Sequence, residues 1–138
     1  MVKIKRFGIS MEEDLLKKLD SLIIKRGYKT RSEALRDFTR EQLVRQEWKN
    51  PNQQVIGTLT LVYNHHARML SDKLADIQHH HHGQIIASTH VHLDEHNCAE
   101  VVIIRGRSAD VQKIADEIIS TKGVKHGKLV MSTTGKEV

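Results

Sequence analysis

The chain has 138 residues, one proline and 28% charged residues, a composition that excludes the disordered and collagen-like classes. No apolar run approaches the roughly 20 residues that a membrane helix needs, and one cysteine cannot form an internal disulfide, so we expect a cytoplasmic protein without a membrane partner. The net charge of +5 arises entirely in residues 1–50, where 13 Lys and Arg stand against 8 Asp and Glu, whereas all ten histidines lie between His65 and His126. This separation predicts two modules, of which the first is suited to binding a polyanion such as DNA.

Residues 3–10 predict a β-strand, because their apolar and polar side chains alternate between two faces. A lone strand has no partner within this module, and an unpaired edge is a liability. Fifty residues are also too few for a secure core of their own. We therefore expect a second chain to donate the same strand, so that the first module is an intertwined dimer with a two-stranded antiparallel ribbon.

Two helices are predicted to follow this strand. The stretch Ser10-Met-Glu-Glu13 has the residue types of a capping box, and Gly27 is a natural C-cap. A second capping box, Thr30-Arg-Ser-Glu33, opens the next helix. Because Pro51 disfavours helix at the residue before it, that helix should end at residue 48 or 49.

Residues 50–54 are interpreted as a linker between a first domain, residues 1–49, and a second domain, residues 55–138. The sequence pattern of the second domain predicts strands and helices in the order βαββαβ, which suggests an α+β ferredoxin-like sheet with both helices on one face. Its strands are expected at 55–63, 85–93, 98–105 and 128–132. Its helices are expected at 67–82 and along the apolar stripe from Val111 to Ile119.

A metal site is predicted where two of these strands meet. His90 and His92 are two positions apart in one strand and therefore share a face. The tight turn at residues 94–97 is short enough to bring Cys98 opposite His92, which gathers two imidazoles and one thiol on one patch of sheet. Glu100 shares the face of Cys98, where it could orient a ligand or be solvated.

The spacing of these histidines and the cysteine does not identify which metal binds or which residue is the fourth ligand. A tetrahedral arrangement would suit Zn²⁺, and a tetragonal or planar one Ni²⁺ or Cu²⁺. The tract His79-His80-His81-His82 ends the preceding helix, and four consecutive positions sweep nearly the whole circumference, so spacing does not identify which of them acts. His65 and His66 are interpreted as ordinary surface.

Together these segments resemble a known family, the nickel-responsive ribbon-helix-helix repressors (NikR). The resemblance runs over essentially the whole chain. Its most specific part is Thr-His-Val-His-Leu-Asp-Glu-His-Asn-Cys at residues 89–98. Further matching segments are residues 6–10, 26–37, 78–82 and 122–127.

The resemblance implies a fold and a metal site. It implies a DNA-binding ribbon-helix-helix joined to a βαββαβ regulatory domain of ACT type, with four such domains forming the core of a homotetramer (a dimer of dimers). It also implies that His90, His92 and Cys98 bind Ni²⁺ in square-planar geometry together with His79 of a neighbouring subunit.

The resemblance further implies that the ribbon enters the major groove of double-stranded operator DNA, with Arg6, Gly8 and Ser10 facing the bases. Gly8 departs from the family, which commonly carries a hydroxyl residue there, so the operator sequence cannot be transferred. Arg6 suits bidentate reading of guanine. Ser32, near a helix N-terminus, is a candidate phosphate contact.

Family members also use an acidic pair matching Glu33 and Asp37 in a secondary cation site; salt bridges to nearby arginines are the alternative. The expected function is a nickel-responsive repressor in which bound Ni²⁺ promotes operator binding. One alternative is a ribbon-helix-helix DNA-binding protein with a structural zinc and no metal gating. A metal-dependent enzyme or carrier is the other, and against an enzyme the chain shows no Gly-rich phosphate loop or nucleophile–base pair.

Overall fold

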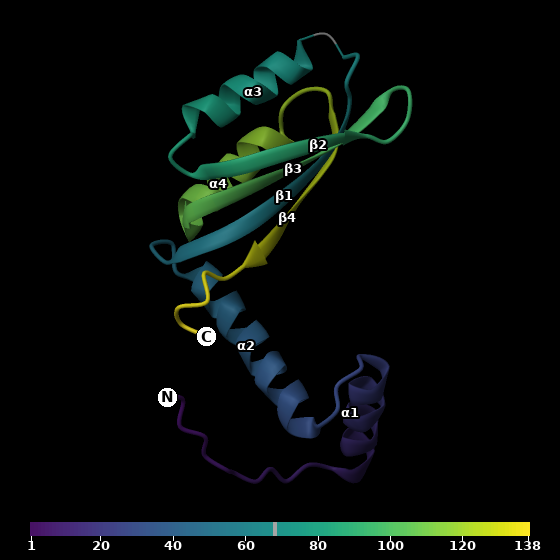
Figure 1. The fold of residues 1–138 in the computed structure, drawn as a ribbon, viewed down its shortest axis with the longest axis vertical. Coiled ribbons are helices and arrows are strands. Elements are labelled where there is room, and N and C mark those ends of the chain that lie inside the picture. The colour runs from purple at the N-terminus through teal and green to yellow at the C-terminus, as the bar shows by residue number, and fades with distance from the viewer. Residues whose placement is uncertain (68) are drawn as a thin grey trace. The chain divides into compact units, whose positions relative to one another are not determined.

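The computed structural model describes residues 1–67 and 69–138, which form two compact units, Met1–Arg40 and Glu41–Val138. The elements in chain order are α1 (Glu13–Lys25), α2 (Arg31–Lys49), β1 (Gln54–Asn64), α3 (Leu70–His80), β2 (Ile85–His92), β3 (Asn97–Arg107), α4 (Ser108–Ile119) and β4 (Val124–Ser132) (Figure 1). Helix α2 begins in the first unit and ends in the second. Among the described residues, no helix combines the length and apolar character needed to cross a membrane.

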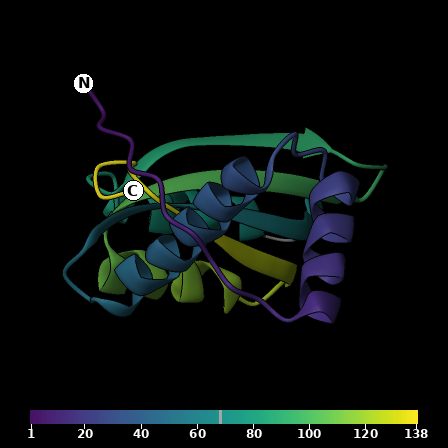
Figure 2. The same cartoon turned by 90° about the horizontal axis from the view of Figure 1, so that it is seen from below.

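The strand predicted at residues 3–10 is not formed in the single chain. Both views draw residues 1–12 as a thin trace without an arrow (Figures 1 and 2), and residues 1–10 are exposed, Phe7 with 80% of its surface. A β-ladder needs the N–H and C=O groups of a second strand. The sheet of the described chain contains only strands β1 to β4, so this segment lacks a pairing strand.

Helix α1 begins at Glu13, two residues later than a cap at Ser10 predicts, so the prediction that Ser10 caps it is wrong. The N-cap is Glu12, and no side chain makes a capping hydrogen bond there. Its C-terminal end confirms the predicted glycine cap. Gly27 has a φ of +79°, and the N–H groups of Gly27 and Tyr28 donate to the carbonyls of the last turn, as in a Schellman motif.

Helix α2 begins with the predicted hydroxyl cap. The Thr30 Oγ1 accepts the N–H of Glu33 at 3.1 Å, while the Glu33 carboxylate accepts the N–H of Lys29 at 3.2 Å. The Arg31 guanidinium donates two hydrogen bonds of 2.8 Å to the Asp20 carboxylate and so ties α2 to α1. This contact also lowers the pKa of Asp20.

The second unit is an antiparallel sheet in the order β2-β3-β1-β4, with β1 paired to both β3 and β4. Along the chain, its strands and helices follow the predicted order βαββαβ. Burial alternates along β1 and β3, so that one face of the sheet is covered and forms the core with α3 and α4 (Figure 1). The largest fully buried core side chains are Leu59, Leu61, Leu74, Ile104 and Ile118.

Helix α3 is shorter than the predicted range 67–82, of which position 68 lies outside the described residues. It ends at His80, and His81 leaves the helical conformation with φ −107° and ψ 27°. Helix α2 ends at Lys49, as the position of Pro51 predicts. Near this end the Trp48 Nε1 donates to the Ser132 carbonyl at 2.8 Å, and Trp48 is buried in the core of the second unit.

Two glycines permit the close packing of this core. A Cβ at Gly57 would lie 2.9 Å from the Leu129 side chain, and a Cβ at Gly127 would lie 2.6 Å from Cγ1 of Ile119. Ile119 ends α4 and Gly127 lies on β4, so the missing side chain sets how closely α4 approaches the sheet.

We therefore expect Gly127→Ala to destabilise the second unit by about 1–3 kcal/mol, because an added methyl group overpacks the α4–β4 contact. Urea unfolding followed by circular dichroism measures the change. Gly83→Ala is the matched control, because a Cβ there meets nothing within 4 Å. Equal stability of Gly127→Ala and the wild type would contradict the packing described here.

Candidate functional site

The candidate metal site lies on β2 and β3, where the strand register aligns the predicted side chains. His92 pairs with Cys98, and His90 pairs with Glu100. Directly opposed residues in an antiparallel pair share a face, so all four side chains lie on the covered face of the sheet. Cys98 is buried, with 1% exposure, whereas both histidines are exposed at the edge strand.

A register shift near the start of β2 makes this alignment possible. Ile85 pairs with Ile104, but Ala87 pairs with Ile103, so β2 holds one extra residue at this point. Because side chains alternate along a strand, one extra residue exchanges the two faces. The shift lets Ile85 pack against the core while His90 and His92 also point to the covered face.

The turn between the two strands is held by Asp94. Its Oδ1 accepts the backbone N–H groups of His96 at 2.8 Å and Asn97 at 2.7 Å. The hydrogen bonds from Asn97, with a smaller contribution from His96, lower the pKa of Asp94 to about 2. The Lys125 Nζ donates to Asn97 Oδ1 at 2.7 Å, which joins β4 to this turn.

Glu100 is buried rather than solvated, with 8% exposure. The Gln78 side chain of α3 donates to its Oε2 at 3.0 Å. Burial raises the pKa of Glu100, and the hydrogen bond from Gln78 opposes that rise. This contact joins α3 to the sheet beside Cys98.

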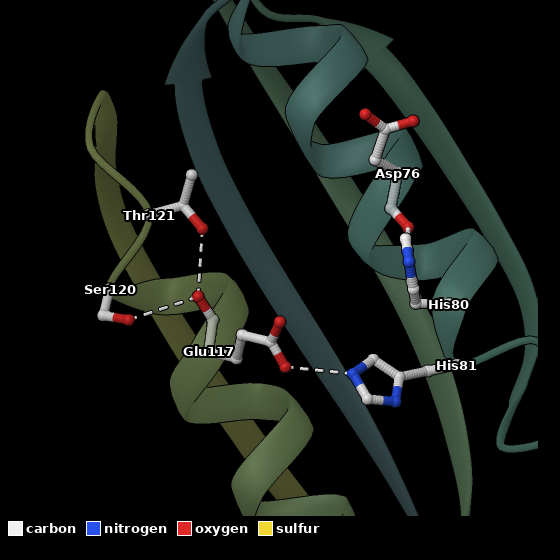
Figure 3. A network of polar contacts seen from close by, with 6 residues as sticks. All are labelled: Asp76, His80, His81, Glu117, Ser120 and Thr121. Carbon is white, nitrogen blue, oxygen red and sulfur yellow. Dashed lines mark hydrogen bonds and ion pairs between the residues drawn. The ribbon is translucent and has the colours of Figure 1, made fainter.

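The four histidines of the tract differ in their contacts. His80 Nδ1 lies 2.8 Å from a backbone carbonyl one turn earlier, and His82 Nδ1 lies 3.2 Å from the carbonyl of His79. His81 Nε2 lies 2.9 Å from the Glu117 carboxylate (Figure 3). Within the described chain, the His79 ring makes no hydrogen bond, so it is the member of the tract with both ring nitrogens available.

His65 and His66 contact the β2–β3 turn, which the interpretation as ordinary surface did not include. The Nε2 atoms of both rings lie within 2.9 Å of the Glu95 carbonyl oxygen. The His65 ring also lies edge-on to His92, with 4.5 Å between centroids. Partial burial, assisted by neighbouring histidines including His66 and His92, lowers the pKa of His65. The sequence carries no signal for this contact beyond the adjacency of the two histidines.

Within the part of one chain that the structure describes, no group of three or more His, Cys, Asp or Glu side chains is gathered closely enough to hold a metal ion. The predicted ligands share a face without converging on one point. Their chemistry fits nickel nonetheless, because imidazole and thiolate are donors that Ni²⁺ binds well.

The predicted DNA-facing residues are accessible. Arg6, Gly8 and Ser10 lie in the exposed segment before α1, and a Cβ at Gly8 would meet nothing within 4 Å. Ser32 is the second residue of α2 and is exposed. Ser32 therefore lies in the first turn of α2, where backbone N–H groups lack intrahelical partners and the N–H of Glu33 is capped by Thr30.

The acidic pair at α2 has local partners. Glu33 accepts the N–H of Lys29, and Asp37 forms an ion pair with Arg40 at 3.3 Å. A hydrogen bond to Asp37 raises the pKa of Tyr28. For Asp37 the structure therefore shows the arginine contact that is the alternative to a cation site.

Two family models match the chain. The model described as the NikR C terminal nickel binding domain matches residues 56–132, and that of the ribbon-helix-helix protein, copG family, matches residues 5–46. The first match runs from the third residue of β1 to the end of β4 and contains His79, His90, His92 and Cys98. The second covers the exposed N-terminal segment from residue 5, with α1 and most of α2.

Close relatives extend over the whole chain. A protein of Solibacter usitatus is 56% identical over 138 residues, covering 100% of this chain and 99% of the relative. A protein of Geotalea uraniireducens is 58% identical over 133 residues, with 96% of each chain covered. Both are named, provisionally, nickel-responsive regulators. The chain belongs to the family of nickel-responsive ribbon-helix-helix (NikR) regulators.

A solved structure shares part of the fold. An uncharacterized protein of Thermotoga maritima matches with a TM-score of 0.51 and 13% identity, covering 56% of this chain and 96% of that protein. At this identity, the likeness concerns the fold alone.

The stability of the β2–β3 turn, which Asp94 holds, should depend on pH. Because the pKa of Asp94 in the folded protein lies below the value of an unfolded aspartate, near 4, its hydrogen bonds stabilise the turn above that pH. This contribution is lost as the pH falls from about 4 toward about 2. We expect NMR titration to show Asp94 protonating near pH 2, and Asp94→Ala to increase amide exchange at His96 and Asn97. An ordinary aspartate titration near pH 4 would contradict the described contacts.

Proposed function

We propose that this protein is a nickel-responsive, sequence-specific transcriptional repressor, in which Ni²⁺ bound by the C-terminal domain promotes operator binding by the N-terminal ribbon. The observation that carries the proposal is the register that places His92 opposite Cys98, within the segment matched by a nickel-binding family model. The same chain carries a ribbon-helix-helix match at residues 5–46. A metal sensor and a DNA reader are thus joined in one polypeptide.

The proposed ligands are His90, His92 and Cys98, with His79 supplied by a neighbouring subunit. His79 is favoured within its tract because its ring is exposed and makes no hydrogen bond among the described residues. Bound Ni²⁺ supplies a link between two subunits. Glu100, held by Gln78, connects this ligand face to α3.

The proposed assembly is a cytoplasmic homotetramer with the second domain, residues 55–138, at its core. This domain is proposed to be ferredoxin-like and of ACT type, and residues 50–54 link it to the DNA-binding domain, residues 1–49. Two features support association: the exposed segment before α1 lacks a pairing strand, and edge strand β2 has apolar side chains such as Val91 exposed to 58%. We further propose that the protein is not an enzyme.

In the proposed complex with double-stranded DNA, two copies of the N-terminal segment pair as a ribbon in the major groove. Arg6, Gly8 and Ser10 then face the bases, and Ser32 contacts phosphate. A cation at Glu33 and Asp37 would have to displace the contacts with Lys29 and Arg40. Metal and DNA binding are coupled reciprocally, typically by about 1–3 kcal/mol, or 5- to 150-fold in affinity.

Selection of bound duplexes from random DNA tests the proposal, with Ni²⁺, with Zn²⁺ and with a chelator. We expect a sequence with two half-sites to be selected only with Ni²⁺. Equal selection under all three conditions would instead support a DNA-binding protein with a structural zinc.

The ligand assignment has its own test. His92→Ala should lower Ni²⁺ affinity, measured by equilibrium dialysis, and should remove the nickel dependence of DNA binding. His126→Ala is the matched control, because His126 is exposed on β4, opposite Val62 on the other face of the sheet. Unchanged nickel affinity in His92→Ala would refute the assignment.

The DNA-reading face is tested by a pair of charge-matched variants. Arg6→Ala should lower the preference for the selected sequence by about 1–3 kcal/mol, because a bidentate contact to guanine is lost. Lys5→Ala removes the same charge from the other face of the expected strand. It should weaken binding to all sequences alike, as measured by gel shift at constant salt.

A further inference from the structure

A contact between the C-cap of α3 and helix α4 lies outside the proposed ligand set. The His81 Nε2 is 2.9 Å from the Glu117 Oε2 (Figure 3). The His81 side chain is 28% exposed and the Glu117 side chain 47%. The Glu117 backbone carbonyl also accepts the hydroxyl groups of Ser120 and Thr121, which close the C-terminal end of α4. Glu117 therefore belongs to a well-fixed part of a helix whose other face is buried in the core.

The backbone of His81 makes hydrogen bonds both to the end of α3 and to the segment that leads into β2. Its N–H donates to the carbonyls of Ile77 and Gln78 as the last bonds of the helix. Its own carbonyl accepts the N–H groups of Gln84 and Ile85 at 2.9 Å each, where the chain turns into β2. A side-chain contact at His81 thus fixes the position at which α3 ends and β2 begins.

The same contact fixes the rotation of the last turn of α3. Successive residues of an α-helix are about 100° apart. His79 lies in the last turn of α3 and His81 is its C-cap, so the two side chains point to different sides of the helix axis. With His81 held against α4, His79 is turned away from α4, where it is exposed. A rotation of this turn by one residue would present His80 or His82 in place of His79.

We infer that Glu117, acting through His81, is a positioning residue that selects His79 from the four-histidine tract as the metal donor. The inference rests on the proposed function, because it concerns the nickel site proposed there. Glu117 touches neither the metal nor its ligands. It acts by holding the end of α3 in one rotation.

Nickel titration of the full-length protein tests the inference. Partners that orient metal ligands typically contribute 10- to 100-fold to affinity, and we expect a loss in that range for Glu117→Ala. Glu117→Gln should restore most of the affinity, because its amide oxygen still accepts a hydrogen bond from His81. Asp116→Ala is the matched control: it removes the same charge from the neighbouring position of α4, and the Asp116 side chain makes no hydrogen bond within the described chain.

Two further readouts separate positioning from general stability. The thiolate-to-nickel absorption band should change in Glu117→Ala, because a different histidine, or none, completes the site. In the metal-free protein, amide hydrogen exchange at residues 81–85 should rise in Glu117→Ala and stay unchanged in Asp116→Ala. His81→Ala provides the same test from the other partner if Glu117→Ala fails to fold.

The inference is overturned if Glu117→Ala binds Ni²⁺ with the affinity and the absorption band of the wild type. It is also overturned if Asp116→Ala loses as much affinity as Glu117→Ala, because charge rather than contact would then be responsible. Failure of the wild type itself to bind Ni²⁺ would refute the proposed function and, with it, the selection of His79. The exchange experiment, which needs no metal, would still show whether the contact holds the end of α3.

Discussion

The register of β2 against β3 is the constraint on which the rest of the second unit depends. Strand β2 must place Ile85 in the core and also turn His90 and His92 to the face that carries Cys98. Strict alternation of side chains along β2 would place Ile85 on one face and His90 and His92 on the other, because an odd number of positions separates them. One extra residue near the start of the strand resolves the conflict, and the Asp94 turn fixes the pairing at the other end.

The face that carries the proposed ligands therefore combines groups with different environments. The thiol of Cys98 is enclosed beneath the helices, and the two imidazoles remain in solvent at the edge of the sheet. Helix α3 approaches the same face through the contact between Gln78 and Glu100 and is anchored to α4 through His81. The helix that covers the core is thus also the one that presents the histidine tract.

Much of this arrangement follows from local sequence patterns. The order of elements, the end of α2 before Pro51 and the glycine cap of α1 depend on periodicity and on residues with restricted or permissive backbones. Pairing of His92 with Cys98 follows from the short turn between their strands. The predicted Ser10 cap is wrong because α1 starts only at Glu13, so that its N-cap is a residue without a capping contact.

Other features depend on contacts between distant segments, which a local pattern does not contain. The contact between His81 and Glu117 spans 36 residues. The contact of His65 and His66 with the Glu95 carbonyl spans about 30 residues in the same way. Gly57 and Gly127 are not in turns, and their role becomes visible only when α4 and β4 are seen in contact.

The unpaired segment before α1 has a consequence for how the protein responds to its own abundance. Within the described chain the sheet offers it no partner strand, so any β-ladder there forms between molecules and its formation obeys mass action. The pairing of this segment would then depend on protein concentration, whereas the ladders of the sheet form within one chain. Dilution would separate two such paired segments from each other, while β2 and β3, which carry the histidines and the cysteine, would stay in register.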